Sequence, residues 1–397
     1  MAIIRNNTDN TFTLVTKNTM YQMKVDDRGV LLHTYYGKKM DYMDMYYYVA
    51  PIDSAAFSPY PVNDKTNDCY SYNHLSQEIS TSGVGDFRLS AIGLRNSDGS
   101  YGCEPRFVSA EIKDGKYSLN GLPAFYGEEA QTLIVTLKDT VHDIYFHLYY
   151  GVFEEYDLIT RSIVIENKTN ATIKLEKALS LSLDMPYGEY DMLYFHGRHT
   201  RERMLEKTKI GHARTTVCSM RGASSHMHNP FVVIADKTTT EDFGSAWGIA
   251  LVYSGNFEIS AEKNLQEKTR VVAGINSENF NFEVCAGDSF TAPEVAMVYS
   301  AQGYASMSNC FHKAIRNNLC RGKFKNAQRP VLINNREGTY FDFNADKLVS
   351  MAHEAAKMGV ELFVMDDGWF GKRDNDRCAL GDWIPNEKKL QGTLKSL

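Results

Sequence analysis

The sequence predicts a multi-domain protein of the β plus α/β class, with a large N-terminal antiparallel β-sandwich followed by the start of a (β/α)8 barrel. Three observations lead to this prediction. Short apolar and aromatic runs separated by turn residues fill the chain from about residue 10 to 300. Apolar residues then recur at helical spacing, and a strand–helix–strand pattern follows. The length of 397 residues also favours two domains over one.

The first 305 residues carry the patterns of antiparallel strands. Leu179 to Leu183 alternates leucine and serine, which predicts a half-buried strand, and much of Tyr145 to Tyr149 alternates in the same way. Aromatic residues make up 12% of the chain, and strands favour such side chains. Three dipeptides are turn signals, the last two of the hairpin type: Asp98-Gly99, Asp114-Gly115 and Asn120-Gly121.

A change of period after the strands predicts a connecting helix over residues 306–320. Its apolar residues recur at helical spacing: Met307, Phe311, Ala314, Ile315 and Leu319. The basic stretch 321–330 that follows is typical of a solvated linker. The predicted domains are therefore a β-sandwich domain at 1–305, a connecting helix and basic linker at 306–329, and the first part of an incomplete barrel at 330–397.

Residues 330–397 follow the order of a βαβ unit. A short strand over 331–334 precedes a helix that begins after Asn344, a residue suited to the N-cap, and ends at Gly359. The wholly apolar run 362–365 predicts a second, parallel strand in a sheet covered on both faces. A complete barrel needs roughly 250 residues, so we expect an expressed segment, a truncated product or one part of a longer gene.

Composition excludes several classes of function. A net charge of −6 argues against nucleic-acid binding, because phosphates select a basic face. No apolar run reaches the roughly 18 residues of a membrane span, and the N-terminal residues lack the apolar region of a secretory signal. The seven cysteines are odd in number and scattered, without Cys-x-x-Cys spacing. We therefore expect reduced thiols in a cytoplasmic protein that binds neither membrane nor nucleic acid.

The sequence implies no cofactor and no metal. His226 and His228 have no third ligand at a recognisable spacing. Asp374 to Asp376 begins like a calcium loop, but Cys378 stands at the fifth position. The chain contains no Gly-x-Ser-x-Gly elbow, no P-loop and no Gly-x-Gly-x-x-Gly motif.

The clearest candidate site follows the last predicted strand. Asp366 and Asp367 come directly after it, with Trp369 beside them, at the carboxyl end where α/β folds bind ligands. Carboxylates accept hydrogen bonds from vicinal hydroxyls, and an aromatic face covers the C–H side of a sugar ring. Adjacent strand-end side chains point to opposite faces, so this pair would not ordinarily bracket one anomeric carbon as two catalytic carboxylates must.

Together these motifs resemble the α-galactosidases of glycoside hydrolase family 36. The second barrel strand of that family ends in the same Asp-Asp-Gly-Trp as residues 366–369, and segments 330–344 and 380–383 are similar to the adjoining family motifs. Segments 77–88 and 221–231 are similar to its N-terminal domain. The resemblance covers essentially the whole chain and implies a β-supersandwich followed by the start of a (β/α)8 barrel.

The resemblance implies a retaining enzyme that hydrolyses terminal α-linked galactose from raffinose- or melibiose-type oligosaccharides. In the family, both catalytic aspartates lie on later barrel strands, so we expect them beyond Leu397 and expect the 397-residue chain alone to be inactive. Asp366 and Asp367 match the pair that binds galactose hydroxyls. The resemblance also implies an α-galactoside ligand and a homo-oligomer, which is a tetramer in full-length relatives.

Two positions depart from the usual family pattern, and a third depends on a neighbouring subunit. Many members carry Trp where Arg336 and His199 stand, although some subfamilies tolerate His at the second position. The first Trp walls the galactose subsite, so Arg336 removes a stacking face and adds a cation that would weaken or redirect sugar binding. Asp53 matches a residue that tetrameric members lend to a neighbouring subunit's site.

Two other functions are compatible with the residues. The first alternative is a non-catalytic module for carbohydrate binding or assembly. The second alternative is an enzyme of the same fold that transfers galactose to another sugar. The residues that separate these functions are expected outside the chain, so the downstream reading frame would distinguish them by two further aspartates at strand ends.

Overall fold

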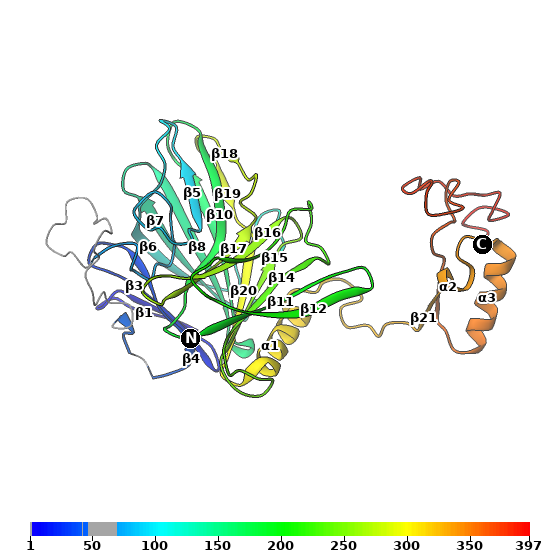
Figure 1. The fold of residues 1–397 in the computed structure, drawn as a ribbon, viewed down its shortest axis with the longest axis horizontal. Helices are drawn as coiled ribbons and strands as arrows, with labels where there is room; N and C mark the ends of the chain where they lie inside the picture. The colour runs from blue at the N-terminus through cyan, green and yellow to red at the C-terminus, as the bar shows by residue number, and fades with distance from the viewer. Residues whose placement is uncertain (1, 42, 47–69) are drawn as a thin grey trace. The chain divides into compact units, whose positions relative to one another are not determined.

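The computed structural model describes residues 2–41, 43–46 and 70–397, which fall into two compact units, Met1–Cys320 and Arg321–Leu397 (Figure 1). The described part of the first unit consists mainly of antiparallel strands, whereas the second contains a parallel strand pair and helices. This confirms the predicted order of a large antiparallel β region followed by an α/β segment. None of the helices in the described ranges has the length and apolar character needed to cross a membrane.

Three antiparallel sheets make up the described part of the first unit. The smallest runs, in spatial order, through β1 (Ile3–Asn6), β2 (Thr11–Val15), β3 (Thr19–Val25) and β4 (Leu31–Lys38). The largest runs through β12 (Arg201–Lys209), β11 (Tyr190–Arg198), β14 (His228–Asp236), β15 (Ala246–Val252), β20 (Glu294–Ser300), β9 (Leu158–Asn167), β8 (Ile144–Phe153), β7 (Gln131–Asp139) and β6 (Pro105–Asp114), and β19 (Ser289–Thr291) pairs with β9. The third runs through β13 (Thr215–Ser219), β16 (Phe257–Lys263), β17 (Thr269–Ile275), β10 (Ile173–Asp184) and β18 (Phe282–Val284), and β5 (Ile92–Arg95) pairs with β10.

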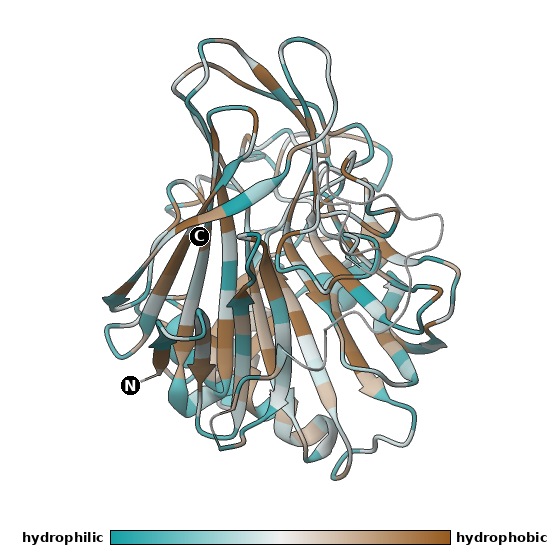
Figure 2. Cartoon of the chain, turned by 90° about the vertical axis from the view of Figure 1, so that its left-hand side faces the viewer, coloured by the Kyte–Doolittle hydropathy of each residue, from teal (hydrophilic) through white to brown (hydrophobic). Residues whose placement is uncertain are grey.

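One large hydrophobic core joins the three sheets. It includes Phe12 of β2, Phe146 of β8 and Leu181 of β10, all buried. Colouring by hydropathy shows apolar segments along the strands and polar ones mainly in the connections (Figure 2). The alternation predicted over 145–149 is confirmed, since Phe146 and Leu148 are buried while Tyr145, His147 and Tyr149 are partly exposed.

The half-buried strand predicted over 179–183 is instead buried on both faces. The leucines join the core, and Ser180 and Ser182 are also fully buried. The Ser182 hydroxyl lies 2.9 Å from the Ser80 hydroxyl, and Ser180 donates to the carbonyl of Pro293. The prediction of a solvent face is wrong, because these internal hydrogen bonds offset the cost of burying the hydroxyls.

The predicted turn glycines adopt left-handed backbone, with φ of +86° at Gly99, +79° at Gly115 and +72° at Gly121. Gly115 and Gly121 both lie in the long connection from β6 to β7, where Asp114 pairs with Gln131. They mark turns within that connection and do not form two-residue hairpins.

Helix α1 (Gly303–Asn318) packs on the largest sheet, mainly against β15 and β20. Met307, Phe311 and Ala314 are buried in a second hydrophobic cluster, which confirms the amphipathic helix predicted over 306–320. A Cβ atom at Gly248 of β15 would lie 2.5 Å from the Phe311 ring and 2.6 Å from the Met307 sulfur. The absence of a side chain at Gly248 therefore allows the close contact between helix and sheet. A short 3-10 helix, η2 (Glu154–Tyr156), precedes β9.

The second unit contains β21 (Leu332–Asn334), α2 (Arg336–Thr339), α3 (Ala345–Lys357) and β22 (Leu362–Val364). The strands pair in parallel, Asn344 caps α3 by accepting a 3.0 Å hydrogen bond from the Lys347 amide, and Gly359 follows the helix at φ +85°. These features confirm the predicted βαβ unit. The prediction that the strand at 362–365 is covered on both faces is wrong for this unit. Leu362 remains 42% exposed, in a sheet of two described strands.

Candidate functional site

The parallel pairing of β21 and β22 brings their following loops to one edge of the sheet. Asn334 aligns with Val364 at the carboxyl ends of the strands. Asn335 is fully buried and donates 2.8 Å from Nδ2 to the Thr339 hydroxyl, while its Oδ1 accepts the Asp366 amide at 2.7 Å. The buried Asn335 side chain therefore links α2 to the loop that carries the two predicted site carboxylates.

The Asp366 carboxylate lies beside the end of β21. The Nδ2 of Asn334 donates to its Oδ2 at 2.5 Å, and the Asp367 amide donates to its Oδ1 at 2.6 Å. Both oxygens thus have a fixed orientation. Since a carboxylate oxygen can accept more than one hydrogen bond, each retains capacity for a ligand hydroxyl.

The Asp367 carboxylate is held by the guanidinium group of Arg373. Nε donates to both carboxylate oxygens, at 2.9 and 3.1 Å, and NH2 donates to Oδ2 at 2.9 Å. Arg373 is only 5% exposed, and its NH1 donates 2.7 Å to the carbonyl of Cys378. Hydrogen bonds from Arg373 lower the pKa of the Asp367 carboxyl from its ordinary value. Asp367 is therefore kept ionised, as a hydrogen-bond acceptor rather than an acid.

Arg336 begins α2 and faces the same carboxylate. Its NH1 lies 3.5 Å from Asp367 Oδ2, and its NH2 lies 3.2 Å from Asp376 Oδ1. The guanidinium also lies over the Phe341 ring, 4.6 Å from the centroid. Arg336 therefore lies beside the Asp367 carboxylate, which the sequence analysis predicts to accept hydrogen bonds from sugar hydroxyls.

Trp369 is half-buried and packs into the small core of the second unit. That core contains Phe343, Leu348 and Leu390. The Trp369 ring meets Phe370 edge-on at 5.1 Å and lies 6.3 Å from the Trp383 ring. These contacts give Trp369 a packing role, while its function as a sugar-stacking face stays a prediction.

The other two predicted site residues belong to the first unit. His199 belongs to the first unit, in the turn between β11 and β12, with an exposed side chain. Asp53 lies outside the described residues. The structure thus brings together Asp366, Asp367 and Arg336 within the second unit.

Sequence reasoning missed Arg373, Asn334 and Asp376 as parts of this cluster. Arg373 lies six residues after Asp367 in an irregular loop, where spacing does not predict contact. A signal was present in the positive charge so close to the paired carboxylates, because a half-buried carboxylate is stabilised by a cationic partner. The arrangement presents oriented carboxylate acceptors with adjacent amide and guanidinium donors, which can form hydrogen bonds with a polyhydroxylated ligand.

Comparison with known proteins gives two family matches. Residues 29–284 match the glycosyl hydrolase family 36 N-terminal domain, and residues 289–397 match the melibiase family. The chain is 46% identical, over its full length, to the bifunctional alpha-galactosidase/sucrose kinase AgaSK of Mediterraneibacter gnavus, of which it covers 42%. It is 40% identical over its full length to the alpha-galactosidase AgaA of Geobacillus stearothermophilus, of which it covers 54%.

Solved structures agree with the sequence matches. The galactosidase domain of AgaSK superposes with a TM-score of 0.96 over 100% of this chain and 55% of that chain, at 46% identity. A doubly substituted variant of the Geobacillus stearothermophilus alpha-galactosidase AgaA, in complex with raffinose, gives a TM-score of 0.93 over 97% of this chain and 54% of that chain, at 41% identity. The chain therefore spans about half the length of the relatives it matches.

Proposed function

The chain belongs to glycoside hydrolase family 36, and from this premise we propose that it forms part of an α-galactosidase whose galactose subsite includes its second unit. The proposed reaction is retaining hydrolysis of terminal α-linked galactose from raffinose- or melibiose-type oligosaccharides. In this reaction one carboxylate attacks the anomeric carbon and a second carboxyl group protonates the leaving oxygen. Both catalytic groups are proposed to lie beyond Leu397.

The orientation of Asp367 is the observation that carries the recognition role. Arg373 holds both carboxylate oxygens, and its hydrogen bonds keep the pKa of Asp367 low. An ionised carboxylate in this position accepts hydrogen bonds from sugar hydroxyls and cannot protonate a leaving group. Asp366, oriented by Asn334, supplies a second set of acceptors on the same loop.

The recognition role is tested by titrating the chain with galactose and following chemical-shift changes by NMR. Asp367→Asn removes the charge of the acceptor, and Arg373→Met removes the group that orients it, so each variant should weaken binding about tenfold or more, since a hydrogen bond to a charged group contributes about 1.5–3 kcal/mol. Arg377→Met is the matched control, because Arg377 is exposed and lies in the same loop. Equal affinity in all four proteins would exclude the assignment.

The hydrolytic role is tested separately with an aryl α-galactoside. The 397-residue chain should show no turnover, because the proposed nucleophile and acid/base are not among its residues. Turnover that persists in Asp366→Asn would show catalytic groups elsewhere in the chain. Turnover that disappears in Asp366→Asn or Asp367→Asn would show that these carboxylates perform chemistry.

We also propose a cytoplasmic homotetramer in which Asp53 and His199 contribute to the sugar site. The cytoplasmic proposal is supported by the scattered cysteines, since the six that lie in the described ranges are all free thiols. The exposed position of His199 in a hairpin turn leaves its side chain accessible to a ligand or a neighbouring subunit. Sedimentation of the protein, with and without Asp53→Ala, would test the assembly.

A further inference from the structure

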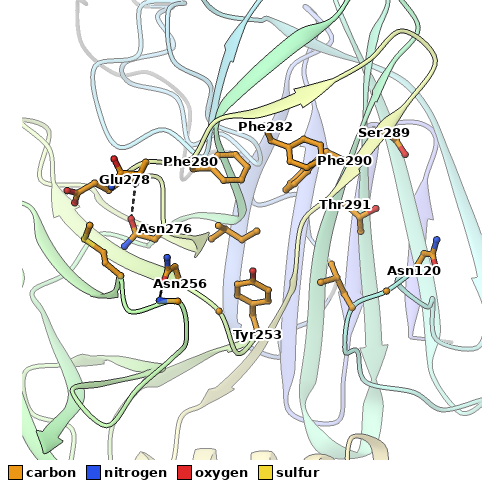
Figure 3. Close-up of a pocket in the computed structure, with 17 residues that line it drawn as sticks. Asn120, Tyr253, Asn256, Asn276, Glu278, Phe280, Phe282, Ser289, Phe290 and Thr291 are labelled. Carbon is orange, nitrogen blue, oxygen red and sulfur yellow. Dashed lines mark hydrogen bonds between the residues drawn. The ribbon is translucent and has the colours of Figure 1, made fainter. Parts of the chain in front are cut away.

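A cleft of about 770 Å³ opens in the first unit, between loops of its two larger sheets (Figure 3). One side is formed by the loop after β17 together with β18, and another by the turn from β15 to β16 and by β19. The connection between β6 and β7 contributes Asn120. This volume falls in the range of sites that bind small molecules, and the lining comes from loops supported by paired strands.

An aromatic surface forms one wall of the cleft. The ring of Phe290 lies 4.9 Å from that of Phe282 and 5.7 Å from that of Phe280. Phe290 is buried, whereas Phe282 is 43% exposed. Tyr253 stands across from these rings and points its hydroxyl toward them (Figure 3). The cleft thus combines exposed aromatic faces with a phenolic hydroxyl.

Amide side chains line the rest of the cleft, and two of them are fixed by the backbone. Asn276 accepts a 2.8 Å hydrogen bond from the Glu278 amide and donates to the carbonyls of Ser219 and Phe257, at 3.3 Å each. Asn256 accepts the Gly222 amide at 2.6 Å through Oδ1, which leaves its NH2 group for a ligand. Asn120 and Asn279 add two more amides.

The charge of the lining limits the class of ligand. Among the described residues that form this cleft, Glu278 is the one charged side chain, and Lys, Arg and His do not occur. A phosphate or carboxylate ligand would meet no cation and one anion, so anions are disfavoured. Amides and a carboxylate can donate to and accept from hydroxyl groups, and aromatic faces can cover the C–H side of a ring.

We propose that this cleft is a second carbohydrate-binding site, in the first unit, for a neutral oligosaccharide. It goes beyond the proposed galactose subsite, which belongs to the Asp366 loop of the second unit. Sugar rings would lie against Phe282, with hydroxyls bonded to the amides and to Glu278. By holding one part of an oligosaccharide, such a site would raise the effective concentration of the rest of that molecule near the protein, without taking part in bond cleavage.

The test is calorimetric titration of the 397-residue chain with raffinose in the Asp367→Asn background, which suppresses binding through the second unit. Phe282→Ala removes the exposed stacking face and should weaken raffinose binding by roughly tenfold, as expected for an aromatic contact. Asn120→Ala removes an exposed amide and should weaken it several-fold. Phe243→Ala is the matched control, since Phe243 is 67% exposed in the same unit and does not line the cleft.

Phe282 and Asn120 are exposed, so the variants should keep the far-ultraviolet circular dichroism and melting curve of the parent. Binding lost in both variants and kept in Phe243→Ala would support the site. Affinity unchanged by Phe282→Ala, no saturable raffinose binding up to tens of millimolar, or binding of choline in place of raffinose would each overturn it. All variants share the Asp367→Asn background and are compared with Phe243→Ala, whereas the galactose titration of the parent and of Asp367→Asn tests the Asp367 assignment separately.

Discussion

Two arginines act on one carboxylate, and their geometries differ at the level of single atoms. Arg373 is nearly buried and makes three contacts of 2.9 to 3.1 Å with Asp367. Arg336 is more exposed and reaches the same carboxylate at 3.5 Å. The first arginine orients Asp367, while the second, under the proposed function, would compete with a sugar hydroxyl for it.

Replacing Arg336 should therefore strengthen sugar binding. Arg336→Trp removes the competing cation from Asp367 and offers an aromatic face, which contributes about 0.5–1.5 kcal/mol beyond burial. We expect galactose to bind several-fold more tightly, as measured by calorimetry. Arg377→Trp provides an exposed control in the same unit. An unchanged or weaker affinity in Arg336→Trp would show that the residue does not border the sugar.

At the scale of elements, α1 and the largest sheet approach each other over Gly248. A Cβ atom at this position would lie within 2.6 Å of both Phe311 and Met307, so Gly248→Ala forces the helix or its side chains to move. We expect the free energy of unfolding to fall by about 1–3 kcal/mol. Gly211→Ala is the control, since nothing lies within 4 Å of its Cβ position. Equal urea midpoints for the two variants would contradict this account of the packing.

A buried cluster of two acids and two arginines joins three other segments of the first unit. Arg270 of β17 donates 2.7 Å to Asp86 and, through Nε, 2.7 Å to Asp184 of β10, and Arg88 donates 2.8 Å to Asp86. Burial alone would raise the pKa of the Asp86 carboxyl, but Arg270 and Arg88 outweigh it and lower the pKa to about 2. The motif around residues 77–88 is therefore, in part, a structural one.

This cluster predicts how stability depends on acidity. Because the folded pKa of Asp86 lies below the ordinary value of 3.8, its contribution is fully present above pH 3.8 and is lost as pH falls through about 2. We expect the free energy of unfolding to decline by on the order of 2 kcal/mol from this residue over that window. Urea unfolding at several pH values measures the decline. The control variant Asp242→Asn, on an exposed loop, should show the same decline as the parent protein. A free energy of unfolding that does not change with pH in the parent would contradict the prediction.

At the scale of the whole molecule, the first unit contains its own sheets and hydrophobic core, and residues 321–331 that follow it are mostly exposed. We therefore expect limited proteolysis to cut near residues 321–330 and to leave a large fragment rich in β structure. Mass spectrometry identifies the cut, and circular dichroism identifies the secondary structure. A helical surviving fragment, or cuts spread through the sheets at the same rate, would show that the unit is not stable alone.

The sequence by itself determined the features that depend on local patterns. Period-two alternation located β8, helical spacing located α1, and Asn344 and Gly359 marked the ends of α3. These features follow from neighbouring residues, because backbone periodicity and capping act over a few positions. The Asp366–Asp367 loop was likewise found from its position directly after an apolar strand.

Tertiary structure alone decided which side chains meet across distant segments. Ser180 and Ser182 have the pattern of a solvent face, yet the fold buries them because hydrogen-bond partners from other segments satisfy their hydroxyls. The contact of Arg373 with Asp367 depends on the path of an irregular loop. The cleft beside Phe282 gathers residues from 120 to 291. No local pattern encodes such contacts, since they arise only when separate strands pair and their loops converge.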